Sequence, residues 1–284
     1  MVKIKHVGVI GAGQMGSGIA QVCVTAGLTV TLIDVSDAAL ERGVSAIAAG
    51  LERQVKKGTL SADARAAALS RIRTHTDHGG LKEVDLVVEA ATENLELKLR
   101  ILKQLSDTVA DGAVIASNTS SISITQLAAV VATPSRFIGI HFFNPVPLMG
   151  LVEVIRGLQT SDATVELAQV FAKTVGKTPV LVRNSPGFVV NRILCPMINE
   201  AILVLQEGLA TVDDIDSGMK LGCNHPIGPL ALADLIGLDT LLAIMEVFST
   251  GFGDPKYRPA PLLKEMVSAG RLGRKTRQGF YNYE

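Results

Sequence analysis

Apolar residues in the first part of the chain alternate between short uninterrupted runs and longer segments where they recur every three or four positions. Short runs are typical of strands buried on both faces, and the periodic segments of helices with one apolar face. Predicted strands cover residues 6–11, 29–34, 84–89, 113–117 and 137–141, and predicted helices cover 14–27, 36–57, 61–70 and 95–109. This alternation predicts an α/β fold whose mostly parallel sheet carries helices on both faces.

The pattern changes near residue 184. A helix over 161–175 and a strand over 179–182 complete the first part, and the turn residues Asn184-Ser185-Pro186-Gly187 follow. Beyond them only helical patterns remain, over 188–206, 212–220 and 237–248. We therefore predict a sheet domain over residues 1–184 and an all-helical domain over 185–284.

Two consecutive helical patterns stand between the second and third predicted strands, where a crossover needs only one. The first repeats Leu40, Val44, Ile47, Leu51 and Val55 at helical spacing. We predict a helical arm over about 36–70, inserted into the sheet domain. Lys56 and Lys57 lie at the tip of its first helix, either as a solvated helix end or as a contact for an anion.

Composition narrows the class of protein. The 284 residues carry 27 basic and 27 acidic side chains, so charge gives no reason to expect a nucleic acid or membrane partner. No apolar run approaches the roughly 20 residues of a membrane span, and Met1–Lys5 leads into a strand without a signal-peptide pattern. Cys23, Cys195 and Cys223 have no metal or disulfide spacing. We expect a cytoplasmic protein without a metal site.

Candidate chemistry begins at the glycine motif "GAGQMG", which contains Gly11, Gly13 and Gly16 and follows the first strand. Gly11 allows a tight turn, Gly13 lets a pyrophosphate approach the backbone, and Gly16 permits close packing of the helix. The next strand ends at Asp34, where a carboxylate would accept ribose hydroxyls of NAD and repel the extra phosphate of NADP. The motif predicts a Rossmann-like domain that binds NAD, against the alternative of a tight turn without a ligand.

Further polar residues follow the later strands. Glu93 comes after the strand over 84–89, and Asn118, Ser120 and Ser121 follow the strand over 113–117. Because parallel strands meet at one edge, these residues are candidates for the same crevice. Ser121 is also a candidate cap for a helix that would begin at Ile122.

A histidine ends the next strand, and a carboxylate interrupts the apolar run after it. His141 and Glu153 lie on either side of a turn whose midpoint is Pro147, so a simple reversal would bring them opposite each other. A buried carboxylate needs a partner, and it would orient the imidazole as a general base. The pair is therefore either a catalytic base with its orienting group or a structural pair that pins the turn.

Beside a nicotinamide, an oriented histidine suits proton removal from a secondary alcohol while the cofactor takes the hydride. Ser120 and Asn191, in "GFVVNRIL", are candidate donors to the carbonyl formed. An exposed or capping amide is the alternative for Asn191.

Seven motifs along the whole chain together resemble the short-chain L-3-hydroxyacyl-CoA dehydrogenases, most closely the stand-alone bacterial 3-hydroxybutyryl-CoA dehydrogenases. They are "GAGQMGSGIAQ", "ASNTSS", "HFFNPVPLMGLVEVI", "SPGFVVNR", "DDIDSGMKLG", "GPLALADLIGLD" and "GRKTRQGFYNY". The resemblance implies NAD-dependent oxidation of (S)-3-hydroxybutyryl-CoA to acetoacetyl-CoA and the reverse reduction. It also implies a homodimer formed through the helical domain, which the many apolar residues of that domain also favour.

Residue by residue, the resemblance implies His141 as the base, Glu153 as its partner, and Ser120 and Asn191 as substrate contacts. It implies a cofactor site formed by Gly11, Ala12, Gly13, Gln14, Met15, Gly16, Asp34, Glu93, Lys98, Asn118, Ser120, His141 and Lys275. Lys57, with Lys56 beside it, would bind CoA. A family serine that contacts CoA aligns with Gly50 here, which puts that contact in doubt.

Two other functions remain open on the sequence. One is a dehydrogenase of another β-hydroxy acid, although that family usually uses a catalytic lysine in its second domain and lacks the His–Glu turn. The other is a dinucleotide-binding protein without turnover. The chain-length preference and the physiological direction do not follow from the sequence.

Overall fold

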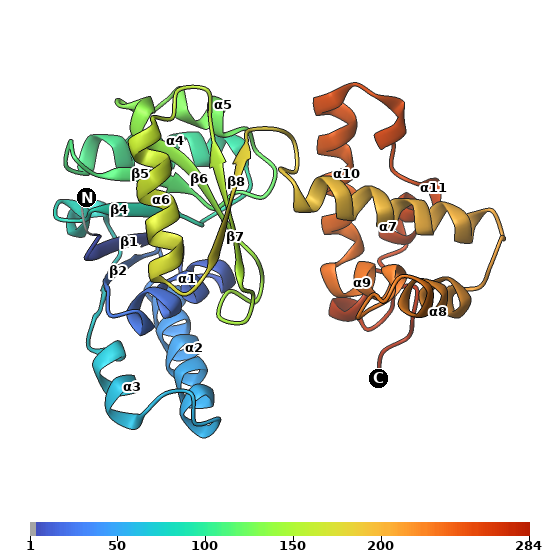
Figure 1. Cartoon of the computed structure of the whole chain (residues 1–284), viewed down its shortest axis with the longest axis horizontal. Helices are drawn as coiled ribbons and strands as arrows, with labels where there is room; N and C mark the ends of the chain where they lie inside the picture. The colour runs from blue at the N-terminus through green and yellow to red at the C-terminus, as the bar shows by residue number, and fades with distance from the viewer. Residues whose placement is uncertain (1–3) are drawn as a thin grey trace. The chain divides into compact units, whose positions relative to one another are not determined.

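The computed structural model describes residues 4–284, and the chain divides into two compact units, Met1–Asn184 and Ser185–Glu284. Each unit has its own apolar core and is described by itself (Figure 1). No helix within residues 4–284 has the length and apolar character that crossing a bilayer requires.

The first unit is built on one eight-stranded sheet in the order β3-β2-β1-β4-β5-β6-β7-β8. Every neighbouring pair is parallel except β6 and β7, which are antiparallel. The strands are β1 (His6–Ile10), β2 (Thr29–Ile33), β3 (Ile72–His75), β4 (Leu86–Glu89), β5 (Val114–Ser117), β6 (Phe137–Phe142), β7 (Leu151–Arg156) and β8 (Thr178–Arg183). The predicted α/β class with a mostly parallel sheet is confirmed.

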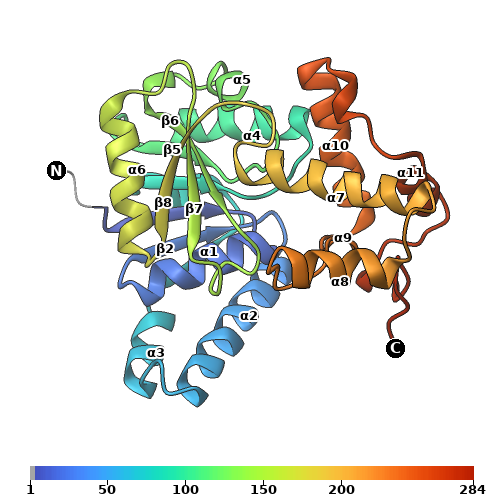
Figure 2. The ribbon, with the colours of Figure 1, turned by 45° about the vertical axis from the view of Figure 1, so that its right-hand side comes forward.

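Helices cover both faces of this sheet (Figures 1 and 2). They are α1 (Gln14–Thr25), α2 (Asp37–Lys56), α3 (Ala62–Leu69), α4 (Leu95–Thr108), α5 (Ile124–Ala128) and α6 (Asp162–Thr174), with short 3-10 turns at η1 (His78–Leu81) and η2 (Pro134–Arg136). Apolar residues of α1, α2 and α6 share one core with the strands. The cap expected at Ser121 is wrong, because Ser123 accepts a hydrogen bond from the N–H of Gln126 and caps α5, which begins at Ile124.

Strand β3 was not predicted, and its composition explains why. It is a four-residue edge strand in which only Ile72 is apolar, so it shows neither alternation nor a buried run. It nevertheless pairs in parallel with β2, with Ile33 opposite His75. As a result, the segment after β3 leaves the sheet at the same edge as the segment after β2.

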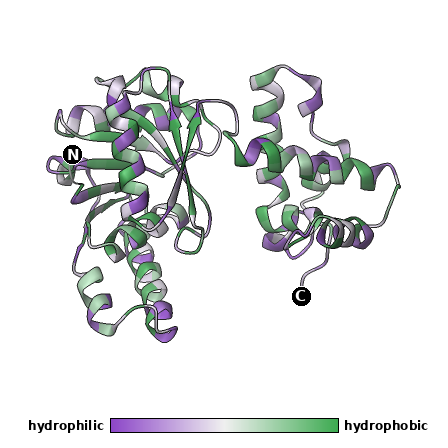
Figure 3. Cartoon of the chain, viewed as in Figure 1, coloured by the Kyte–Doolittle hydropathy of each residue, from purple (hydrophilic) through white to green (hydrophobic). Residues whose placement is uncertain are grey.

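The predicted arm consists of α2 and α3, with serine caps at Ser36 and Ser61. It packs on α1 and on the loop before it through glycine: a Cβ on Gly43 would lie 2.9 Å from Ser17 Oγ and 2.9 Å from the carbonyl oxygen of Ala12. An ion pair of 3.2 Å between Arg65 and Glu52 joins the two helices. The far end of the arm is hydrophilic, as Figure 3 shows in purple, whereas the central strands are green.

The second unit is helical throughout. It contains α7 (Val190–Gln206), α8 (Val212–Gly222), α9 (Pro229–Ile236), α10 (Leu238–Phe252) and α11 (Pro261–Ser268), with 3-10 turns η3 (Pro255–Tyr257) and η4 (Arg274–Thr276). Helices α9 and α11 were not predicted, since eight residues that begin at proline give too short a periodic pattern. Buried Asp234 on α9 holds the C-terminal tail by accepting hydrogen bonds from the N–H groups of Phe280 and Tyr281.

Candidate active site

The three motif glycines occupy three different environments. Gly11 has a φ of 97°, and a Cβ there would lie 2.7 Å from the carbonyl oxygen of Ala90. A Cβ on Gly16 would lie 1.8 Å from the carbonyl oxygen of Gly11, so only glycine lets α1 pack on the loop. A Cβ on Gly13 would meet no atom within 4 Å. The loop and the start of α1 therefore leave open space where a pyrophosphate fits the backbone N–H groups.

Asp34 is held against this loop. Its Oδ2 accepts a hydrogen bond of 2.9 Å from the N–H of Ala12, and its Oδ1 accepts one of 3.2 Å from the N–H of Ser36. Gly11 and Asp34 line a groove together with Ala91 and the apolar side chains of Val35, Leu97 and Ile101. Val35 is almost fully exposed. An apolar wall beside a carboxylate suits an adenosine, whose ring stacks on the wall and whose ribose hydroxyls reach Asp34.

Lys98 lies beneath the edge of the sheet. Its ammonium forms an ion pair with Glu89, and the hydroxyl of Ser117 donates a 2.8 Å hydrogen bond to the same carboxylate oxygen. Lys98 is 1% exposed, and Glu89 and Ser117 are fully buried. The other oxygen of Glu89 accepts from the N–H of Ala91, which lies beside Gly11. The resemblance implies that Lys98 belongs to the cofactor site, and the structure places its ammonium in a buried network that supports the loop after β4.

The remaining polar residues of this edge form short connections between neighbouring strand ends. Glu93 accepts hydrogen bonds from the N–H of Ser120 at 2.9 Å and from the hydroxyl of Thr119 at 2.7 Å. The side-chain oxygen of Asn118 accepts from the N–H of Phe142 at 2.8 Å, and Asn118 is buried. Asn118 is thus fixed beside the end of β6, the strand that carries His141, and Ser120 is tied to the loop after β4.

His141 and Glu153 are directly opposite each other in the antiparallel ladder of β6 and β7. The distance between His141 Nδ1 and Glu153 Oε2 is 2.8 Å, Glu153 is 0% exposed, and His141 is 6% exposed. The expected reversal around Pro147 is confirmed. The carboxylate fixes the ring and favours a proton on Nδ1, which makes Nε2 the ring nitrogen with acceptor character.

A buried lysine holds the loop between β6 and β7. Lys177 donates hydrogen bonds of 2.7 Å to the carbonyl oxygen of Val146 and 2.8 Å to that of Met149. Burial lowers the pKa of its ammonium. Val146 also packs on α1, where a Cβ on Gly18 would lie 2.9 Å from it. Sequence reasoning missed Lys177, since a lone lysine after a helix carries no motif.

A second groove runs along α1 between the arm and the 144–147 loop. Its walls include Gln14 and Gln21 from α1, Arg42 and Arg53 from α2, and Asn144. The charged side chains among its lining residues are these two arginines. Lys56 and Lys57, the predicted CoA contacts, are exposed at the end of α2 and do not line this groove. Met15 packs on the apolar core of the unit.

Two predicted site residues belong to the second unit. Asn191 lies in the first turn of α7. Lys275 lies in η4, where its ammonium pairs with Asp239 at the start of α10. Burial raises the pKa of Asp239, but the hydrogen bond from Lys275 and other bonds outweigh it, so the pKa lies below its usual value.

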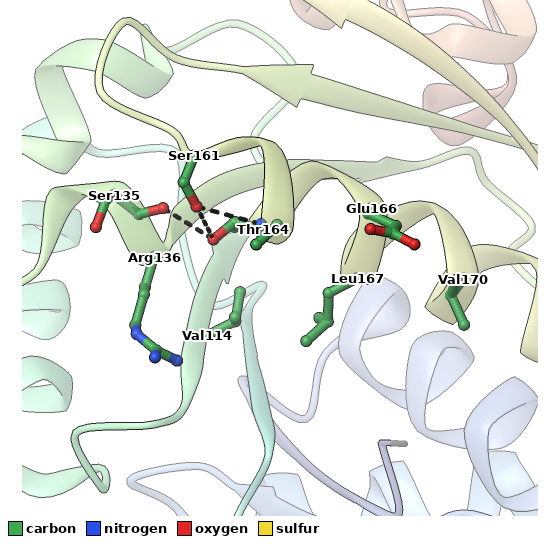
Figure 4. Close-up of a pocket in the computed structure, with 9 residues that line it drawn as sticks. Val114, Ser135, Arg136, Ser161, Thr164, Glu166, Leu167 and Val170 are labelled. Carbon is green, nitrogen blue, oxygen red and sulfur yellow. Dashed lines mark hydrogen bonds between the residues drawn. The ribbon is translucent and has the colours of Figure 1, made fainter. Parts of the chain in front are cut away.

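Another pocket lies on the first unit away from these residues (Figure 4). It is lined by Ser135 and Arg136 before β6 and by Ser161, Thr164 and Glu166 around the start of α6. Its polar groups serve the helix cap: Ser161 accepts from the N–H of Thr164, whose hydroxyl donates to the carbonyl oxygen of Ser135. Among residues 4–284 no cluster of His, Cys, Asp and Glu could hold a metal ion.

A glycine loop, an acid after β2 and a carboxylate-oriented histidine at one sheet edge define the class: a Rossmann-type, dinucleotide-binding oxidoreductase fold. The chain matches the 3-hydroxyacyl-CoA dehydrogenase NAD-binding domain over residues 6–185 and the C-terminal domain over 187–283. It belongs to the 3-hydroxyacyl-CoA dehydrogenase family.

Similar proteins span the whole chain. A 3-hydroxybutyryl-CoA dehydrogenase of Bradyrhizobium diazoefficiens is 54% identical, covering 99% of this chain and 96% of the relative. One from Clostridioides difficile is 47% identical, covering 97% and 98%. The crystal structure of (S)-3-hydroxybutyryl-CoA dehydrogenase PaaH1 from Ralstonia eutropha superposes with a TM-score of 0.97 at 61% identity, covering 99% of this chain and 100% of that one.

Proposed function

We propose that the chain catalyses the NAD-dependent interconversion of (S)-3-hydroxybutyryl-CoA and acetoacetyl-CoA. The observation that carries this proposal is the 2.8 Å contact between His141 Nδ1 and Glu153 Oε2. His141 lies near the carboxyl end of β6, and the glycine loop follows the carboxyl end of β1 in the same sheet. The activity named for the similar proteins supports the choice of substrate.

In the oxidation, His141 Nε2 accepts the hydroxyl proton of the substrate. Glu153 holds the Nδ1 proton, keeps the ring in place, and stabilises the imidazolium that forms. The bound dinucleotide supplies the hydride acceptor for oxidation and the hydride donor for reduction. In the reduction, the imidazolium of His141 returns its proton to the carbonyl oxygen.

Ser120 and Asn191 orient the carbonyl or hydroxyl group of the substrate in this proposal. The position of Ser120 supports its role, because Glu93 accepts the Ser120 N–H and thereby holds the residue at the end of β5. Donors held in place before the reaction stabilise charge on the substrate oxygen without reorganisation.

The cofactor is NAD rather than NADP. Asp34 faces the groove next to the glycine loop, and its carboxylate suits two ribose hydroxyls while repelling a 2′-phosphate. Residues 11–16, Glu93, Asn118, His141 and Lys275 complete the proposed contacts. Lys98 supports the cofactor site through its ion pair with Glu89, which holds the N–H of Ala91.

The CoA moiety lies along the arm, where Lys56 and Lys57 meet its phosphates. Arg42 and Arg53 add two cations in the groove that runs from α2 towards the 144–147 loop. At Gly50, a Cβ would lie 2.3 Å from the side-chain oxygen of Gln21, so the Gln21 carboxamide occupies the space of a larger residue. The Gln21 carboxamide therefore places a polar group next to Gly50, the position at which the family has a serine.

Two further expectations belong to this proposal. The chain forms a homodimer through residues 185–284, and exposed apolar side chains in that unit, including Ile193, Leu209 and Leu221, support this. It works in the cytoplasm, where the three unpaired thiols stay reduced.

The test is an assay of NADH oxidation by its absorbance with acetoacetyl-CoA as substrate. The proposal predicts turnover with acetoacetyl-CoA and much less with free acetoacetate, since the CoA contacts would be lost. Turnover of free β-keto acids only would favour the other dehydrogenase, and NADH binding without turnover would favour a non-catalytic dinucleotide-binding protein.

A further inference from the structure

The groove beside Asp34 carries more negative charge than one NAD-recognising acid accounts for. Three carboxylates line it, those of Asp34, Asp77 and Asp107, and none of its lining residues is a lysine or arginine. This contrasts with the groove on the arm side of α1, where the charged side chains are Arg42 and Arg53. A ligand in the groove beside Asp34 therefore meets carboxylates but no lysine or arginine.

Asp77 reaches this groove because of the unpredicted strand β3. The N–H of Asp34 donates to the carbonyl oxygen of His75 at 3.4 Å, so the ends of β2 and β3 lie side by side. Asp77 follows two residues after His75. Its Oδ1 accepts a 2.8 Å hydrogen bond from the N–H of Gly79, which fixes the side chain as the cap of η1.

The neighbouring histidine does not neutralise this acid. His78 lines the same groove, and burial lowers the pKa of its imidazole, with only partial opposition from Asp77. A histidine with a lowered pKa is neutral at pH 7. No cation among the lining residues therefore offsets the carboxylates of Asp34 and Asp77, which follow the neighbouring ends of β2 and β3.

We propose that Asp77 is a second determinant of cofactor specificity, which acts with Asp34 to reject a dinucleotide carrying a 2′-phosphate. This inference rests on the proposed use of NAD. A phosphate near the ribose of a dinucleotide bound at Asp34 would face Asp77 as well, and like charges repel at short range. Removal of Asp34 alone leaves the second carboxylate, so it does not make the groove tolerant of the phosphate.

The experiment measures binding without turnover. Isothermal titration gives Kd for ADP-ribose and for 2′-phospho-ADP-ribose with the wild type, four single variants and one double variant. The single variants are Asp34→Ser, Asp77→Asn, Asp77→Ser and Asp107→Asn, and the double variant combines Asp34→Ser with Asp77→Asn. Asparagine and serine both cap a helix as aspartate does, so Asp77→Asn and Asp77→Ser keep the cap of η1. Asp107→Asn is the matched control, because Asp107 lines the groove ten residues beyond Leu97 on α4, about 15 Å along the helix.

We expect Asp77→Asn to lower the ratio of the Kd for 2′-phospho-ADP-ribose to the Kd for ADP-ribose about 3- to 10-fold, by weakening the discrimination against the phosphate. The double variant lowers this ratio further than Asp34→Ser, Asp107→Asn leaves it unchanged, and added salt shrinks each effect. The inference is overturned if Asp77→Asn and Asp77→Ser keep the wild-type ratio of the two Kd values, whether binding of both ligands is unchanged or weakened by the same factor. A wild type that binds ADP-ribose but does not reduce acetoacetyl-CoA would refute the proposed function and leave this inference standing.

Discussion

Gly13 and Gly16 are both glycines, but for different reasons. At Gly16 the reason is internal, since a Cβ would collide with the carbonyl oxygen of Gly11. At Gly13 the protein itself leaves open space. The residue scale thus separates positions required by the fold from positions required by a ligand, which the motif alone does not do.

This difference gives a matched pair of variants. We expect Gly13→Val to fold with a melting temperature near that of the wild type, and to bind NADH at least about tenfold more weakly because the side chain projects towards the pyrophosphate. Gly16→Val should lose about 1–3 kcal/mol or more of stability through overpacking. Thermal unfolding and NADH titration of both variants check this; equal loss of stability in the two would contradict it.

The three cysteines give a second prediction at this scale. Burial raises the pKa of the Cys23 thiol above its usual value and that of Cys195 to about 12, whereas Cys223 is exposed. Only thiolates react readily. At mildly alkaline pH we expect one fast-reacting thiol per native chain with Ellman's reagent, all three in denaturant, and none that reacts fast in Cys223→Ser. A fast-reacting thiol in that variant would refute the assignment.

At the scale of elements, predictability follows the clarity of the apolar pattern. Strands β1, β4 and β6 are apolar runs buried inside the sheet, and they were predictable from the sequence. The pairing of His141 with Glu153 was predictable too, because a hairpin fixes its own register around its turn. Edge strand β3, helices α9 and α11, and the acids and lysines that support the site were not, because long-range packing defines them. Asp77, Lys177 and Glu89 acquire their places beside the site only in the folded chain.

The arm yields a prediction of its own. Replacing Lys56 and Lys57 together with alanine should raise KM for acetoacetyl-CoA and leave KM for NADH unchanged, with a smaller effect at high salt, where phosphate attraction is screened. Arg53→Ala, which changes a cation that lines the groove, is the companion variant. Steady-state kinetics at low and high ionic strength measure both. If KM for acetoacetyl-CoA stays constant at low salt in all variants, the arm does not hold CoA.

At the scale of the whole molecule, the prediction concerns assembly into a homodimer. Ile193 is 67% exposed, Leu209 75% and Leu221 87%, all in the helical unit. These apolar side chains would leave water if the helical unit packed against a second chain. We expect light scattering at micromolar concentration to return twice the 29.9 kDa mass of the chain. A mass of one chain would contradict the dimer.

The most direct test of the catalytic account is the kcat of Glu153→Gln with acetoacetyl-CoA and NADH. Glutamine preserves shape but can neither hold the Nδ1 proton as a carboxylate does nor stabilise the imidazolium. Glu166→Gln, at an exposed position of α6, is the control. We predict a kcat lower by about 10²-fold or more, with KM for NADH and the melting temperature close to wild type, and no change in the control. A Glu153→Gln variant with near-normal kcat would contradict the account and leave the pair a structural one.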